Sequence, residues 1–226
     1  MTSIDTITLE VTDPTAAERF YADAFGLGSR LRLRASQEPS EGFRGFTLSL
    51  TVSQPANVDA LISSALAAGA TTLKAPAKSM WGYGGVVQAP DGAIWKVATS
   101  AKKDTGPAAR EFDAIVLLLG VDDVVASKKF YASRGLSVGK SFGRMYVEFE
   151  TGPVKLALYR RRALAKDAGV APAGTGSHRI AVVGGEDAFT DPDGFAWETT
   201  ASAEVLMCRY RLYAMARPGS AEEEDP

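Results

Sequence analysis

Apolar and polar side chains alternate at every second position in many stretches of the chain, which predicts strands with one buried face. In residues 4–11 the apolar side consists of Ile7, Leu9 and Val11, and the opposite side carries Thr6, Thr8 and Glu10. The strands predicted in this way cover residues 4–11, 30–35, 46–52, 71–74, 84–89, 94–99, 113–120, 137–141, 144–150, 153–159, 178–183 and 195–200.

Apolar residues at spacings of three and four predict three helices. They cover residues 14–26, 55–69 and 123–134, and the second has Pro55 near its start and Gly69 at its end. Arg160 to Thr175 is a basic excursion rich in alanine and glycine, with no predicted element. Residues 203–217 fit either a terminal helix or an extra strand, and the acidic end from Ser220 is expected to be disordered.

The chain repeats itself. The strand–helix opening at 6–21 ends with Phe20-Tyr21, seven residues after Asp13, and the one at 116–131 ends with Phe130-Tyr131, seven residues after Asp123. The closing segment 81–97 returns in shortened form as 188–199, with a Pro-Asp-Gly turn and a tryptophan in both. Such a repeat indicates an architecture built by duplication.

Four units follow from the repeat. Strand–helix–three-strand units are complete at 46–99 and 113–160, whereas 4–35 lacks its last strands and 178–200 lacks its helix. We therefore expect an N-terminal domain at 1–100, a linker at 101–111, a C-terminal domain at 112–202 and an extension at 203–226.

These openings and the closing Asp191-Pro-Asp-Gly-x-x-Trp-Glu198 resemble the vicinal oxygen chelate superfamily, which includes glyoxalase I, bleomycin-resistance proteins and extradiol dioxygenases. The resemblance implies an α+β fold in which tandem βαβββ units, some truncated, form two glyoxalase-like cup domains. In the metalloenzymes of this superfamily, each of four cup strands supplies one metal ligand.

The resemblance places the ligand positions of the N-terminal half at Thr6, Thr47 and Lys96. None of these is a carboxylate or an imidazole, and an ammonium group repels a cation. A metal site of the family type is therefore not expected in this half.

The C-terminal half has Val116 and Ala157 at two ligand positions, and His178, the only histidine, and Glu198 at the other two. Two protein ligands are fewer than the three of a catalytic zinc site. One interpretation is a histidine–carboxylate hydrogen bond without any cofactor. The other is a weak site for a divalent metal (Zn, Ni, Co, Mn or Fe), completed by water, Tyr159 or substrate.

The cup faces suggest a ligand pocket. Hydroxyls of Thr6, Thr8, Thr47 and Ser49, together with Lys96, could surround a polar or anionic small molecule, and the alternative is a solvated sheet face with a snorkelling lysine. Trp81 and Tyr83 could stack on a planar ligand or serve as core or interface residues, and Tyr159 borders the second cup.

The pairing of the units stays open. Units one with two and three with four would give the cups just described. If the two complete middle units pair instead, Lys96, Val116 and Thr47 share one cup, and Thr6 joins His178 and Glu198 in the other. The resemblance also allows a homodimer, because cups in this superfamily are sometimes completed across one.

Composition narrows the function. The 226-residue chain has a net charge of −2 and a pI near 5.6, which gives no electrostatic case for nucleic acid or an anionic membrane. No apolar run is long enough to span a bilayer, and the single Cys208 fits a reducing cytoplasm. Three functions remain: a metal-free small-molecule binding protein, a metal-dependent lyase or dioxygenase using His178 and Glu198, and a partner-binding protein with vestigial cups.

Overall fold

The computed structural model describes residues 3–175 and 179–200. The helices are α1 (Pro14–Ala24), α2 (Pro55–Ala67), α3 (Val124–Ser133) and α4 (Arg161–Ala168), with the 3-10 helix η1 (Gly28–Arg30). The strands of the first half are β1 (Thr6–Val11), β2 (Leu31–Ala35), β3 (Glu41–Gly42), β4 (Phe46–Thr51), β5 (Thr71–Ser79), β6 (Gly82–Gln88) and β7 (Ile94–Thr99). Those of the second half are β8 (Ala114–Val121), β9 (Ser137–Phe142), β10 (Tyr146–Glu150), β11 (Val154–Arg160), β12 (Gly174–Thr175), β13 (Ile180–Val183), β14 (Phe189–Thr190) and β15 (Ala196–Glu198).

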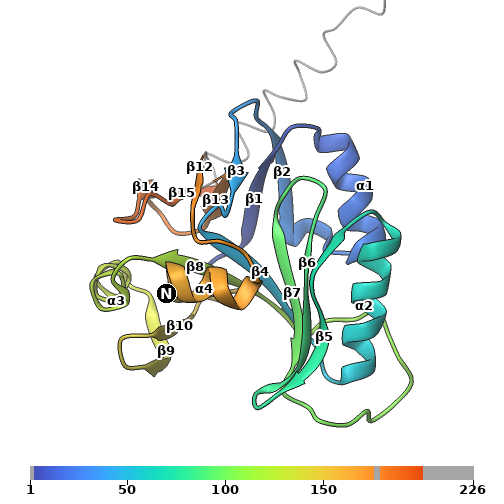
Figure 1. Ribbon diagram of the computed structural model, residues 1–226. Helices are drawn as coiled ribbons and strands as arrows, with labels where there is room; N and C mark the ends of the chain where they lie inside the picture. Colours follow the sequence, from blue (N-terminus) through green and yellow to red (C-terminus); the bar gives the residue numbers. More distant parts are fainter. Residues whose placement is uncertain (1–2, 176–178, 201–226) are drawn as a thin grey trace, which may run out of the picture.

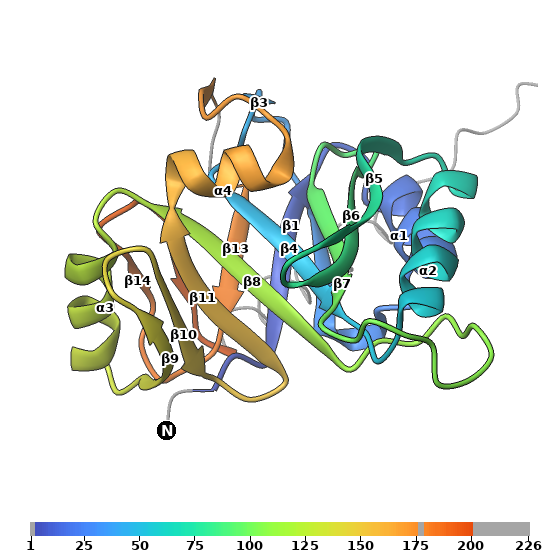
Figure 2. The same cartoon turned by 60° about the horizontal axis from the view of Figure 1, so that its bottom comes forward.

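Two mixed sheets form the body of the molecule. The eight-stranded sheet has the order β5-β6-β7-β4-β8-β11-β10-β9, and the five-stranded sheet has the order β14-β15-β13-β1-β2. Figure 2 shows the larger sheet running from β9 near α3 at one end to β5 near α2 at the other. A short ribbon of β12 and β3 completes the fold.

Both sheets combine strands from the two halves of the chain. β4 pairs antiparallel with β8, which joins the two complete middle units, and β1 pairs antiparallel with β13, which joins the outer units. The alternative pairing predicted from the sequence is therefore confirmed, and the pairing of units one with two and three with four is wrong. The alternation of apolar and polar residues within one strand shows which face is buried but not which strand lies beside it. The local pattern therefore could not decide between the two pairings.

The truncation of the first unit also differs from the prediction. The last strand of each other unit lies parallel beside the first strand of that unit, as β7 does beside β4, β11 beside β8 and β15 beside β13. β2 lies parallel beside β1 in the same way. The first unit thus keeps its last strand and lacks the two middle strands.

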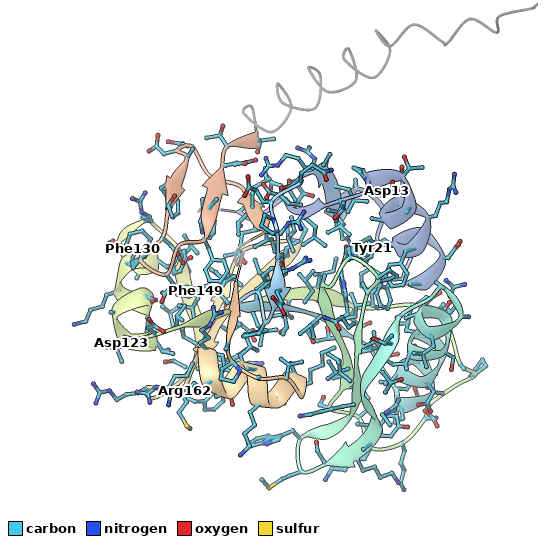
Figure 3. All side chains as sticks on the ribbon, turned by 45° about the horizontal axis from the view of Figure 1, so that its top comes forward. Asp13, Tyr21, Asp123, Phe130, Phe149 and Arg162 are labelled. Atoms are coloured by element: carbon cyan, nitrogen blue, oxygen red, sulfur yellow. The ribbon has the colours of Figure 1, made fainter. Side chains whose placement is uncertain are left out.

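The repeated aspartates begin helices. Figure 3 labels Asp13 and Asp123 at the starts of α1 and α3. The side chain of Asp13 accepts a hydrogen bond from the backbone N–H of Ala16, and that of Asp123 accepts from Val125 and Ala126. These bonds satisfy backbone donors that have no partner inside the first helical turn. Backbone hydrogen bonds to the Asp123 carboxylate lower its pKa.

The repeated tyrosines lock the helices to the closing turns. Tyr21 of α1 donates its hydroxyl to Asp91 Oδ2 over 2.7 Å and accepts from Trp95 Nε1 over 3.4 Å. Tyr131 of α3 donates to Asp191 over 2.6 Å and accepts from Trp197 over 3.2 Å. The motifs that carried the resemblance therefore hold consecutive units together on the helix side, while the sheets join other pairs.

Residues 101–111, the expected linker, contain no helix or strand. The domain boundaries on either side of them stay a prediction. The extension at 203–226 lies outside the described residues. Within the part of the chain that the structure covers, no helix has the length and apolar character needed to cross a membrane.

Candidate functional site

The cup face of the eight-stranded sheet brings together many of the predicted residues. Cross-strand neighbours pair Thr47 with Leu118, and Ser49 with both Val116 and Lys96. Lys155 lies beside Val116, and Ala157 beside Leu118. The four positions that the resemblance assigns to metal ligands in this cup are therefore Thr47, Lys96, Val116 and Ala157. None of these four side chains is a carboxylate or an imidazole.

Helix α4, which the sequence analysis missed, covers part of this face and contacts β4, β8 and β11 (Figure 1). Its buried residues Leu164, Ala165 and Ala168 cluster with Phe43, Val86 and Ile94, and the partly buried Leu118 and Tyr159 pack against the cluster. The helix ends at Gly169, whose φ of 84° is a left-handed conformation suited to glycine. Residues 161–168 of the segment expected to be an excursion thus form a helix that packs on this cup face.

Charges at the end of α4 fix it to the sheet. Lys96 Nζ lies 2.7 Å from Asp167 Oδ2, and the two side chains are 35% and 44% exposed. Lys74 Nζ donates to the carbonyls of Lys166 and Asp167 over 2.8 and 2.6 Å. A cation is favoured at a helix C-terminus because the last carbonyls carry partial negative charge. Lys96, predicted to meet an anionic ligand, therefore has an internal carboxylate partner.

The predicted aromatic wall lies at the hairpin between β5 and β6. Trp81 is 80% exposed at the tip, next to Met80, which is 82% exposed. Tyr83 donates its hydroxyl to Asp59 Oδ1 of α2 over 2.8 Å, so its ring lies on the helix side of the sheet. Trp81, Tyr83, Lys96 and Asp167 all border one open cavity of about 240 Å³.

The five-stranded sheet presents a different cup face. Arg34 of β2 donates from Nη1 to Glu198 Oε1 of β15 and from Nη2 to Glu10 Oε1 of β1, both over 2.7 Å. Since β13 and β1 lie between β15 and β2, the bond to Glu198 spans two intervening strands on this face. The three side chains are 22 to 26% exposed. Burial lowers the pKa of Arg34, but the bonds to Glu198 and Glu10 outweigh it, and the net shift is upward.

Other polar groups share this face. Arg32 lies opposite Thr8 in the sheet, and Thr6 donates its hydroxyl to the carbonyl of Ser29 over 3.1 Å. Arg179 precedes β13, lies beside Glu10 and donates from Nη2 to the carbonyl of Ser36 over 2.8 Å. Among residues 3–175 and 179–200, the buried atoms Arg32 Nη1 and Arg179 Nε have no hydrogen-bond acceptor.

The sequence analysis missed Glu10, Arg32, Arg34 and Arg179 as site residues. The alternation Leu31-Arg32-Leu33-Arg34 was a usable signal, because it places both arginines on the face opposite the core. The bond from Arg34 to Glu198 joins residues far apart in the sequence and had no local signal.

No protein-family model and no curated protein sequence matches the chain. Solved structures do. Glyoxalase I from Zea mays is 13% identical, with a TM-score of 0.59 over 96% of this chain and 98% of its own. A putative dioxygenase from Bacillus subtilis is 12% identical, with a TM-score of 0.56 over 98% of both chains. The chain has the vicinal oxygen chelate fold.

In metal-dependent proteins of the vicinal oxygen chelate fold, the cup strands would supply the ligands, so Glu198 is the described residue to examine. Its carboxylate is bound to a guanidinium, and a metal ion there would have to displace Arg34. Thr6, the other predicted member of this cup within the described residues, is bound to a backbone carbonyl. His178 lies outside the described residues. Among residues 3–175 and 179–200, no three His, Cys, Asp or Glu side chains are grouped to hold a metal. The described residues therefore do not fit a divalent metal.

Proposed function

We propose that the protein is a metal-independent small-molecule binding protein whose ligand lies against the concave face of the five-stranded sheet. The observation that carries this proposal is the guanidinium of Arg34 bound to both Glu10 and Glu198. This contact supports a cup in which protein side chains, and no metal ion, supply the hydrogen-bond donors to the ligand. The covering of the other cup by α4 favours the same sheet.

The charges of this face favour an anion. Arg32, Arg34 and Arg179 oppose Glu10 and Glu198, which leaves one net positive charge on the described part of the face. Guanidinium groups bind carboxylate and phosphate oxygens in a planar, two-pronged geometry. A small carboxylate or phosphate ester that binds through Arg32 is the ligand class that this charge balance supports.

The test is a thermal-shift screen of tag-free, chelator-treated protein. The panel contains small carboxylates, phosphate esters and matched uncharged esters at constant ionic strength. A carboxylate at 100 times its dissociation constant should stabilise the fold by about 2.7 kcal/mol, and the matching ester should not. Arg32→Gln should remove the effect, whereas Arg19→Gln, on the exposed side of α1, should retain it. A panel that leaves the melting temperature unmoved counts against ligand binding.

The alternative is a lyase or dioxygenase that uses His178 and Glu198 with a divalent metal. Glyoxalase I and the putative dioxygenase with the same fold favour it. It requires Glu198 to exchange Arg34 for a metal ion. Turnover that survives both His178→Ala and Glu198→Ala would exclude it.

Two further points belong to the proposal. The single cysteine supports a cytoplasmic location, because a reducing compartment makes no use of disulfides. Each sheet pairs strands from both halves of one chain, so the proposed site does not require a homodimer.

A further inference from the structure

We infer that Arg34 has taken the place of the metal ion in this cup and keeps divalent cations out of it. The inference shares with the proposed function the premise that the cup works without metal. It goes further because it assigns one residue as the cause. Three observations carry it: the geometry of the two bonds, the charge balance, and the position of Arg34 in the sheet.

The geometry shows one cation between two carboxylates. Both bonds end on the same planar guanidinium, so Glu10 and Glu198 are held close together although β13 separates their strands. One of these carboxylates, Glu198, lies in β15, the last strand of the fourth unit, directly after the repeated Trp197. Each carboxylate accepts through Oε1 alone, so the guanidinium opposes a metal ion by its positive charge and by its place between the two carboxylates.

The charge balance explains why the guanidinium is needed. Without Arg34, two carboxylates would face each other in a half-buried cup, and each would disfavour the ionised form of the other. A divalent cation would relieve this repulsion, and so does a guanidinium. Arg34 is part of the chain, so it is present at every metal concentration and binds without loss of translational freedom.

The position of Arg34 follows from the truncation of the first unit. β2 lies parallel beside β1, in the place that β7, β11 and β15 take in the other units. Last strands of this kind carry Lys96, Ala157 and Glu198, the positions at which the metalloenzymes of the superfamily hold closing ligands. By register, Arg32 lies beside Thr8 as Lys96 lies beside Ser49 and Ala157 beside Leu118, so Arg32 takes the equivalent position and Arg34 lies two residues further along β2. Neither arginine offers a metal ion a free oxygen or nitrogen lone pair. The guanidinium of Arg34 thus places a positive charge on the strand from which a metalloenzyme would supply a ligand for a cation.

The experiment is a titration of the full chain with Mn²⁺, which prefers oxygen ligands. Calorimetry and the melting temperature are recorded for the wild type and for Arg34→Met, which keeps the apolar stem and removes the charge. The wild type should show no saturable binding up to 1 mM, about the weak limit of metal modules. Arg34→Met should bind Mn²⁺ at least about tenfold more tightly, and Mn²⁺ should raise its melting temperature.

Two controls locate the effect. Arg32→Met removes an arginine two positions away on the same strand, and this variant should show no saturable Mn²⁺ binding. Glu198→Gln in the Arg34→Met background should abolish the gained binding. If Arg34→Met does not fold, Arg34→Gln, which retains hydrogen-bonding capacity, is measured in its place with the same expectations.

Two outcomes would overturn the inference. One is wild-type Mn²⁺ binding that Glu198→Gln abolishes, because a metal then enters despite Arg34. The other is the absence of any gain in a folded Arg34→Met or Arg34→Gln variant. Neither outcome decides whether the cup binds a small anion, since that is read from the ligand screen of the wild type without metal.

Discussion

At the scale of single residues, the two copies of the closing turn use different aspartates for the same purpose. Tyr21 binds Asp91, the aspartate of Pro90-Asp91-Gly92. Tyr131 binds Asp191, two residues earlier in its turn, and the equivalent Asp193 accepts from the hydroxyl of Ser127 and the backbone of Asp122. Each copy thus satisfies the hydroxyl of a buried tyrosine, and the motif serves the fold.

Tyr131→Phe tests this role. The change leaves Asp191, which is 5% exposed, without its side-chain donor, and we expect a loss of about 1–3 kcal/mol in the free energy of unfolding. Tyr83→Phe is the matched control, because its bond to Asp59 is exposed and should contribute less than about 1 kcal/mol. Urea unfolding at pH 7 measures both. Equal losses in the free energy of unfolding for the two variants would show that the buried hydrogen bond contributes no more to stability than the exposed one.

The same tyrosine gives a pH dependence. Burial and then the charge of Asp191 raise the pKa of Tyr131, so the folded state holds this proton more tightly than the unfolded chain. Its contribution to stability is therefore complete below about pH 10, the unfolded pKa, and decreases above it by about 1.4 kcal/mol per pH unit. Tyr21 is shifted in the same direction. Urea titrations between pH 9 and 11 should show a shallower decline for Tyr131→Phe than for the wild type, and parallel slopes would contradict the assignment.

At the scale of elements, local patterns predicted what local physics determines. Alternation located the strands beside the cores, such as Phe46–Thr51, and the proline and glycine at its ends located α2. The eight-residue helix α4 was missed because its few apolar residues span barely two turns. The pair Lys96–Asp167 depends on that helix, so no local pattern indicated that Lys96 has a carboxylate partner within the chain.

Helix α4 should be a stable part of the fold. Leu164 is 1% exposed and packs in the cluster over the cup face, so Leu164→Ala should cost about 2–5 kcal/mol. Asp167→Ala removes only a half-exposed ion pair and should cost less than about 1 kcal/mol. Urea unfolding of both variants makes the comparison. A small loss for Leu164→Ala would mean that α4 is loosely held and that the cup of the eight-stranded sheet is accessible after all.

At the scale of the whole molecule, the two kinds of contact join different units. Sheet hydrogen bonds connect unit one with four and unit two with three, whereas the tyrosine–aspartate bonds connect one with two and three with four. One continuous core includes Leu9, Leu50, Leu117 and Val182, which come from all four units. No unit therefore completes both its sheet and its helix side with one neighbour.

This closed arrangement predicts that the halves depend on each other. A chain cut in the exposed segment 101–111 would give fragments that each expose the strand edges of β1 and β4, or of β8 and β13. Such edges and their apolar faces are not stable in water. We expect each fragment alone to lack a cooperative unfolding transition, and the mixture to regain one with a 1:1 complex by size-exclusion chromatography and circular dichroism. A fragment that unfolds cooperatively as a monomer would instead support two independent domains. The strand pairing across the halves would then form by association of two separately folded domains.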